Sequence, residues 1–216
     1  MSSVAFGISA VLASLSESSN VKRQVDLQII ADWMDPGSRI LDLGCGRGVL
    51  LEHLKGSRDI RGVGVDIDFK KILACIQRGL TAYQGDIGSV ISEFPDNFFD
   101  WVICSRTLQE LDNPTFIIKE SLRVGRRMAV GFVNYAFWGN RLNILWHGSR
   151  ISKSGHPVTW SQSRLFNPLS IEEFERFCEQ SQLRIERRVY LKGDWRTPCK
   201  AFPNIRSAYA LYAITR

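Results

Sequence analysis

The ten residues from Arg39 to Gly48 constrain the fold of this chain more than any other stretch. A short apolar run carrying Asp42 leads into glycines at alternate positions, and a helical pattern begins at Val49. Glycine permits positive φ angles and lets a ligand approach the backbone closely, and the first N–H groups of a helix have no partner within the helix. The run therefore predicts a buried strand, a tight turn and a helix start, with Asp42 as an acceptor at the strand end.

The spacing Asp-x-Gly-x-Gly-x-Gly differs from the Gly-x-Gly-x-x-Gly that fits a dinucleotide pyrophosphate. It resembles motif I of the class I S-adenosylmethionine-dependent methyltransferases. The alternative is a glycine-rich turn in another kind of α/β protein. In the resemblance, Asp42 and the backbone of Gly44, Cys45 and Gly46 hold the methionine part of the cofactor.

Two further acidic residues follow predicted strands. Asp66 ends the strand 62–65, and an acid about 20 positions past the glycine loop reaches ribose hydroxyls in this architecture; the alternative is a helix N-cap, a role we assign to Asp68. Asp86 follows the predicted strand 80–84. In the methyltransferase resemblance Asp86 accepts from the adenine amino group, Ile87 packs on the ring, and Ile67 packs against the cofactor.

The remaining pattern alternates strands with helices. We expect helices over 25–33, 49–55 (capped by Gly56), 69–78 and from Pro114 to Gly125, and strands over 39–43, 99–105 and 127–132. The helix after Asp68 is expected to place Phe69, Ile72, Leu73 and Ile76 on one face. Ser105, at the end of the fourth strand, would border the transferred methyl group.

The alternation pauses over about 133–168. This stretch is rich in aromatic residues, amides and bases, and it follows the fifth strand, beside the expected cofactor mouth. We expect either a lid over substrate or a partner surface; a local minicore of short helices is the alternative. Thr107, Gln109 and Asn134 are placed to orient a methyl acceptor.

The last part of the chain predicts a capped helix and two strands. Ser170 and Glu173 form a capping box, and the strands 183–191 and 207–215 follow with no long helix between them. The fold class is therefore α/β, a Rossmann-like class I methyltransferase fold with a mostly parallel seven-stranded sheet, an antiparallel last strand and helices on both faces. We expect residues 1–22 to form a flexible extension, with a signal peptide as the weaker alternative, and 23–216 to form a single domain.

The composition argues against three other kinds of protein, namely zinc-binding, membrane-spanning and nucleic-acid-binding proteins. The five cysteines are widely spaced and include no Cys-x-x-Cys pair, so the sequence does not indicate a zinc site. Cys75, Cys104 and Cys178 fall in apolar patterns and are expected to be core thiols, which favours a reducing cytoplasm. No apolar run has the roughly 20 residues of a membrane span. The net charge of +6 comes from scattered bases, which favours solvated surface over a nucleic-acid face.

A more specific resemblance covers residues from about 25 to 188. The chain resembles MetW, the methionine biosynthesis protein family of bacteria. The resemblance rests on Asp26–Trp33, Gly37–Gly46, Phe94–Asn97, Thr107–Gln109, Leu122–Arg127, Trp138, Asn140–Leu142 and Leu183–Arg188. Two departures fall in the 133–168 segment or at its end, namely Val133-Asn134 for the family's Pro-Asn and Asn167 near a family histidine.

The resemblance implies a cytoplasmic, S-adenosylmethionine-binding protein that acts in methionine biosynthesis with homoserine O-acyltransferase as its partner. Three hypotheses stay open at this point. The protein is a non-catalytic sensor of this kind, or an active methyltransferase on a small molecule, or, least favoured, a nucleic-acid methyltransferase. A sulfonium methyl group is transferred by in-line displacement, in which positioning supplies much of the catalysis, so no catalytic residue is assigned.

Overall fold

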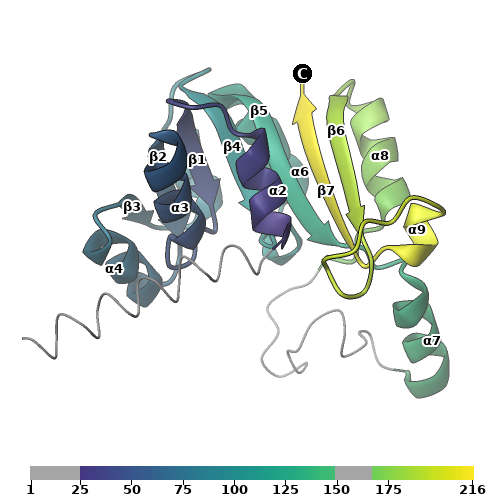
Figure 1. The fold of residues 1–216 in the computed structure, drawn as a ribbon. Helices are drawn as coiled ribbons and strands as arrows, with labels where there is room; N and C mark the ends of the chain where they lie inside the picture. The colour runs from purple at the N-terminus through teal and green to yellow at the C-terminus, as the bar shows by residue number, and fades with distance from the viewer. Residues whose placement is uncertain (1–24, 149–166) are drawn as a thin grey trace, which may run out of the picture.

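The structure is a computed structural model that describes residues 25–148 and 167–216 (Figure 1). The strands of its sheet are β1 (Arg39–Leu43), β2 (Arg61–Asp66), β3 (Thr81–Gln84), β4 (Phe99–Ser105), β5 (Gly125–Val133), β6 (Arg184–Leu191) and β7 (Tyr209–Thr215). The helices are α2 (Val25–Trp33), α3 (Val49–Arg58), α4 (Phe69–Gln77), α5 (Ile87–Ser92), α6 (Pro114–Val124), α7 (Trp138–His147), α8 (Ile171–Gln180) and α9 (Pro203–Arg206), with a 3-10 turn at Leu108–Glu110.

The seven strands form one sheet in the order β3-β2-β1-β4-β5-β7-β6. Strands β1 to β5 pair in parallel, whereas β7 is antiparallel to both β5 and β6. This confirms the predicted mostly parallel sheet with an antiparallel last strand. The carboxyl ends of β1, β2, β3 and β4 consequently meet at one edge, which is where open α/β sheets bind ligands.

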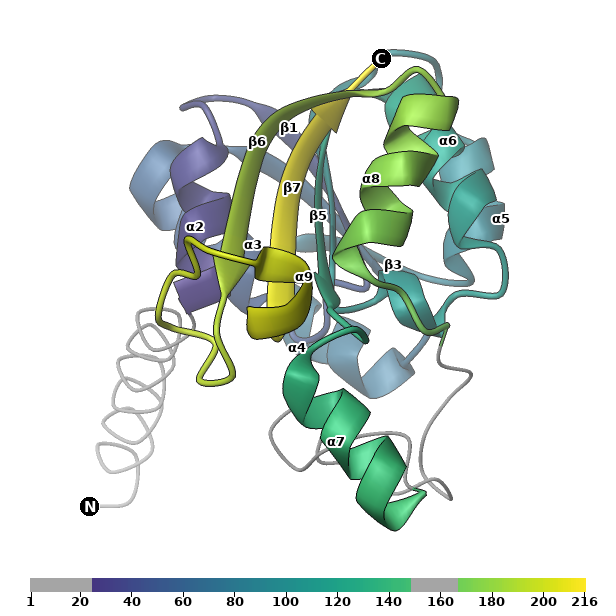
Figure 2. The same cartoon turned by 90° about the vertical axis from the view of Figure 1, so that its right-hand side faces the viewer.

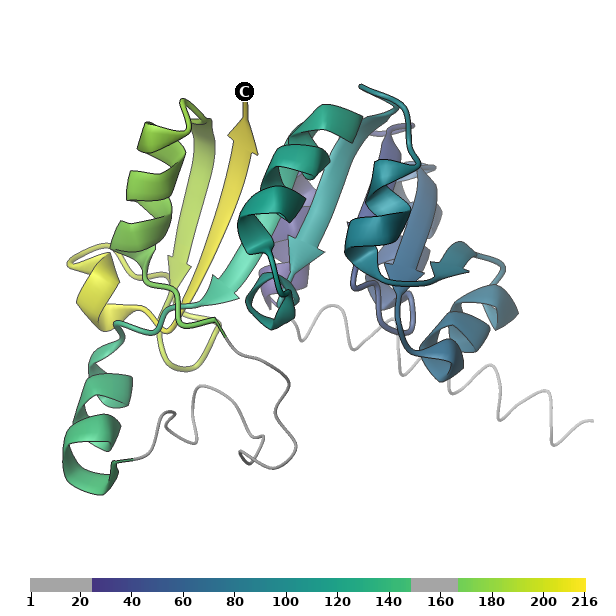
Figure 3. The same cartoon turned by 180° about the vertical axis from the view of Figure 1, so that it is seen from behind.

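Helices cover both faces of the sheet, as predicted, and Figures 2 and 3 show these two layers from the side and from behind. Both faces are apolar and need cover, as the side chains of β4 show, because successive side chains of a strand point to opposite faces. Trp101 and Ile103 pack in the core shared with α2, α3 and α4, whereas Val102 and Cys104 pack in the core shared with α5, α6 and α8. The thiols of Cys75, Cys104 and Cys178 are buried and free, which confirms their assignment to the core.

Local capping signals set several helix starts as expected. Asp68 caps α4, Asn113 caps α6 with Pro114 in the first turn, and Ser170 and Glu173 form the reciprocal capping box of α8. The prediction that Gly56 ends α3 was wrong, since the helix continues to Arg58 and its C-cap is Asp59 at a φ of 51°. Sequence reasoning also missed α5, a helix of 6 residues that is too short to display a periodic pattern.

The predicted apolar face of α4 is only partly buried. Ile72 and Cys75 pack in the core, but Phe69, Leu73 and Ile76 are exposed. The neighbouring strand β3 has 4 residues and lies at the edge of the sheet. The sheet therefore offers this helix too little surface to cover its whole apolar side.

Two predicted segments lie wholly or partly outside the described residues, namely the 1–22 extension and the 149–166 part of the 133–168 insertion. The part of the insertion that is described holds α7, a helix of 10 residues. Within the described ranges, no helix combines the length and apolar character required to span a membrane.

Candidate functional site

A cleft of about 710 Å³ opens at the carboxyl edge of the sheet, between the ends of β1, β2 and β4 and the loop after β3. Its lining includes all nine residues predicted from the sequence, namely Asp42, Gly44, Cys45, Gly46, Asp66, Ile67, Asp86, Ile87 and Ser105. The volume lies within the range of small-molecule and cofactor sites. The sheet therefore gathers the predicted residues around one cavity, and their roles toward a ligand stay predictions.

The glycine loop adopts the backbone that its sequence requires. Gly44, Gly46 and Gly48 have φ angles of 77°, 57° and 75°, a region that residues with a Cβ rarely adopt. A Cβ on Gly44 would lie 2.1 Å from Oγ1 of Thr107, whereas a Cβ on Gly46 would meet nothing within 4 Å. Gly44 is thus required by close packing, while Gly46 leaves open space beside the cleft.

The amide groups of this loop are already used within the protein. The N–H groups of Gly44 and Cys45 both donate to the carbonyl of Val65, at 2.8 and 3.0 Å, and the Gly46 N–H donates to Asp66 Oδ2 at 3.0 Å. The loop therefore presents its open surface, rather than these three donors, to any molecule in the cleft.

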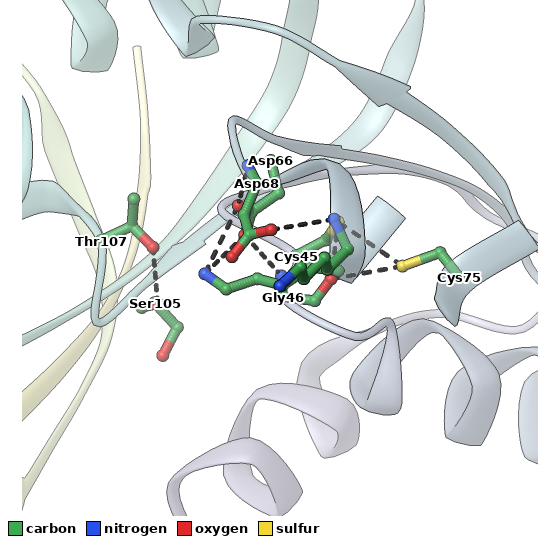
Figure 4. A network of polar contacts seen from close by, with 9 residues as sticks. Cys45, Gly46, Asp66, Asp68, Cys75, Ser105 and Thr107 are labelled. Carbon is green, nitrogen blue, oxygen red and sulfur yellow. Dashed lines mark hydrogen bonds and ion pairs between the residues drawn. The ribbon is translucent and has the colours of Figure 1, made fainter. Parts of the chain in front are cut away.

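Asp66 joins the loop to the start of α4 (Figure 4). Besides accepting from Gly46, it accepts from the Asp68 N–H through Oδ1 at 2.9 Å, and Lys71 Nζ donates to Oδ1 and Oδ2 at 3.4 and 3.3 Å. Because an ionised carboxylate offers about four lone-pair sites, a further donor to Asp66 would take the place of Lys71. Lys71, which also lines the cleft, had no recognisable signal in the sequence.

Asp42 is a buried carboxyl of the site, with 5% of its surface exposed. Burial raises its pKa to about 7, and the charge of nearby Asp66 contributes in the same direction. A buried carboxylate is unfavourable unless a cation or donor compensates for lost hydration. This end of the cleft is therefore suited to a positively charged group.

Asp86, Ile87 and Ile67 differ in their exposure, and Asp86 is exposed. Asp86 caps α5 by accepting from the Ser89 N–H at 3.1 Å, so the N-cap role that we considered for Asp66 falls to Asp86 and Asp68. Ile87 is buried beneath the cleft, whereas Ile67 is half exposed at its rim.

At the end of β4, the Ser105 hydroxyl lies 3.1 Å from the hydroxyl of buried Tyr209 on β7. Thr107 lines the cleft and donates from Oγ1 to the Ser105 carbonyl at 3.3 Å. Gln109 and Asn134, which were expected to face a methyl acceptor, are buried and do not line the cleft. Gln109 instead exchanges hydrogen bonds with the backbone of Val133, at 2.9 and 3.1 Å.

Arg106 follows β4 in the stretch expected to border the methyl group, and it lines the cleft, but its ion pair was not predicted from the sequence. Its backbone has a φ of 65°, its guanidinium forms an ion pair with Asp26 of α2 at 2.6 Å, and it lies 5.3 Å from the centre of the Trp195 ring. The side chain of Asp26 is 2% exposed and that of Arg106 is 40% exposed. The sequence signal for this ion pair was Asp26 on the buried side of α2, because a buried carboxylate needs a partner.

The cysteine of the glycine loop is not an activated nucleophile. Cys45 lies 4.0 Å from Cys75, measured between the two sulfur atoms. Burial raises the pKa of both thiols, and the charge of Asp42 adds to this effect. Thiolates, not thiols, react and bind metals, and among the described residues no cluster of metal-ligating side chains is found.

Solved structures share this architecture and identify the fold of the protein. A methyltransferase dependent on S-adenosylmethionine from Archaeoglobus fulgidus superimposes with a TM-score of 0.64 over 92% of both chains, at 14% identity. Another from Aquifex aeolicus matches with a TM-score of 0.59, at 17% identity, over 92% of this chain and 98% of that one. The fold is therefore that of the class I S-adenosylmethionine-dependent methyltransferases.

The family is narrower than this class. The model of the methionine biosynthesis protein MetW family matches residues 24–214, and the chain belongs to that family. A bifunctional methionine biosynthesis protein MetXA/MetW of Rhodopirellula baltica is 33% identical over 60% of this chain and 22% of its own length. A ubiquinone biosynthesis O-methyltransferase of Hahella chejuensis is 29% identical over 42% of this chain and 40% of its own length. The chain thus spans about a fifth of the first relative and two fifths of the second.

Proposed function

We propose that this protein binds S-adenosylmethionine in the cleft and acts in methionine biosynthesis together with homoserine O-acyltransferase. The observation that carries the binding proposal is the gathering of the nine predicted residues around one cavity of cofactor size. The observation that supports the partnership is the Rhodopirellula baltica relative, in which MetXA and MetW form one polypeptide.

The residues of the cleft fit the parts of this ligand. The open surface of Gly46 accommodates close approach of the methionine part, and Asp42 offers its carboxyl to a cation. A bound cation would lower the pKa of Asp42 from its raised value, so ligand charge and carboxylate charge would stabilise each other.

The nucleoside part is assigned to the next two strand ends. Asp66 would accept from the ribose hydroxyls in place of Lys71, whose side chain is 40% exposed, while Ile67 packs at the rim. Asp86 and Ile87 would hold the adenine. When bound, the cofactor supplies an electrophilic methyl group.

Thermal unfolding tests the binding proposal directly. At about 100 times its dissociation constant, a ligand that binds only the folded state stabilises it by about 2.7 kcal/mol. We expect S-adenosylmethionine and S-adenosylhomocysteine to raise the melting temperature by about 5–11 °C, given roughly 2–4 °C per kcal/mol for a chain of this size. A melting temperature unmoved by both compounds, in a sample that unfolds cooperatively, would contradict the proposal.

An active methyltransferase is the second candidate. The feature that favours it is the end of β4, where Thr107 and Ser105 border the cleft and can position an acceptor. Transfer of a labelled methyl group to a metabolite would establish this activity. Cofactor binding without turnover, together with a stable complex with the acyltransferase, would instead establish a sensor that adjusts the acyltransferase to methionine supply.

A further inference from the structure

Helix α7 presents a continuous apolar stripe to solvent. Trp138, Leu142, Leu145 and Trp146 are 51%, 42%, 73% and 72% exposed, and their spacing of i, i+4, i+7 and i+8 places them on one side of a helix. We call these four residues the α7 stripe. Figures 1, 2 and 3 all show α7 extending away from the sheet beyond the end of β5.

The base of α7 is hydrogen-bonded to Asn134, which is fully buried. Its Nδ2 donates to the carbonyls of Asn204 and Ser207 at 2.9 and 2.8 Å, and its Oδ1 accepts from the Ile171 N–H at 3.3 Å. Its own carbonyl accepts from Asn140 Nδ2 of α7 at 3.2 Å. Asn134 and Asn140 together therefore link α7 to α8 and α9, and a surface held in place loses less conformational freedom on binding.

Within 25–148 and 167–216, the α7 stripe lies outside both the cleft and the hydrophobic cores. Single exposed apolar side chains are ordinary on a protein surface, but contiguous ones mark interaction sites. Tryptophan in particular is enriched among the residues that dominate binding energy at protein interfaces.

We propose that the α7 stripe is the docking surface for homoserine O-acyltransferase, an inference that rests on the partnership proposed above. The occupant is argued from the Rhodopirellula baltica relative, which joins MetXA and MetW in one chain. An amphipathic helix of this kind binds by placing its apolar face in a groove. The charged residue of the described helix beside the stripe is Arg141, so the partner's groove is apolar with an acidic rim.

The test mixes the full-length protein with the purified homoserine O-acyltransferase of the same organism and measures the dissociation constant by titration calorimetry. Leu145→Glu places a charge at the centre of the stripe and should weaken the complex at least about 30-fold, the scale of a dominant interface residue. Ile76→Glu is the matched control, because Ile76 is an apolar helix residue that is 56% exposed on α4. We expect it to bind the partner as the wild type does.

The outcomes separate the two proposals. Both variants should keep the wild-type thermal response to S-adenosylmethionine, since neither position lines the cleft. If the wild-type protein forms no complex, the partnership fails and the docking surface fails with it, while cofactor binding stands. If the complex forms but Leu145→Glu binds normally, only the docking surface is refuted.

Other occupants of the stripe would also refute the inference. A dimer of the isolated protein that dissociates in Leu145→Glu would assign the stripe to a second copy of the chain. Protection of Trp146 from hydroxyl-radical oxidation in the isolated monomer would show that the chain itself covers the stripe. Binding of the wild type to anionic lipid vesicles, abolished by Leu145→Glu, would assign it to a membrane surface.

Discussion

Replacing Gly46 by alanine separates the cost of backbone strain from the cost of obstructing the cleft. Gly46 and Gly37 have φ angles of 57° and 74°, and a Cβ on either would meet no atom within 4 Å. A left-handed conformation costs a residue with a Cβ about 1–2 kcal/mol. Both Gly46→Ala and Gly37→Ala should therefore lower the ligand-free melting temperature by about 2–8 °C.

The two variants should diverge once ligand is added, because Gly46 lines the cleft and Gly37 does not. In Gly37→Ala, S-adenosylhomocysteine at about 100 times the wild-type dissociation constant should still stabilise the fold by about 2.7 kcal/mol. In Gly46→Ala the added methyl group occupies the space that the ligand needs. A tenfold loss of affinity would reduce the stabilisation to about 1.4 kcal/mol at the same ligand concentration.

Differential scanning fluorimetry with and without ligand measures both effects in one experiment. Calorimetric titration of each variant gives the affinities independently. Equal ligand-induced shifts in Gly46→Ala and Gly37→Ala would show that the ligand does not approach the glycine loop. The assignment of Gly46 to the methionine part would then be wrong, even if the protein binds the cofactor elsewhere in the cleft.

Two further predictions concern buried charges. The pKa of Asp42 is about 7 in the folded chain against an ordinary 3.8, so stability should fall as pH rises from about 4 to 7, by roughly 4 kcal/mol at 1.36 kcal/mol per pKa unit. Asp42→Asn should lack this loss, so urea unfolding without ligand at pH 8 should find the variant more stable than the wild type. If the stability of both proteins depends on pH in the same way, the assignment of this effect to Asp42 is wrong. Arg106→Met leaves Asp26 buried without its ion-pair partner and should lower the free energy of unfolding by roughly 2–4 kcal/mol, at the lower end for a buried pair because Arg106 is 40% exposed. Arg106→Lys keeps the charge and is the control. If Arg106→Lys loses as much stability as Arg106→Met in the same urea unfolding experiment, the charge is not responsible.

Much of the fold followed from local features of the sequence. The strand carrying Asp42, the capping roles of Asp68, Asn113 and Ser170, and the antiparallel C-terminal pair were all predicted and confirmed. Capping and strand periodicity are properties of a few neighbouring residues, so they can be recognised without knowledge of the rest of the chain. Helix α5 was not predicted, because 6 residues are too few to show a helical periodicity of apolar side chains.

The sequence by itself determined that acids and glycines end consecutive strands, and a parallel sheet brings such ends to one edge whatever the packing details. Only the tertiary structure decided how these groups are used. The environment of Asp42, the contacts of Asp66 with Gly46 and Lys71, and the pairing of Arg106 with Asp26 join residues far apart in the chain. The position of α7 likewise depends on Asn134, whose hydrogen bonds join it to α8 and α9. Charge burial and side-chain exposure are set by the whole surrounding structure, which no local stretch of sequence encodes.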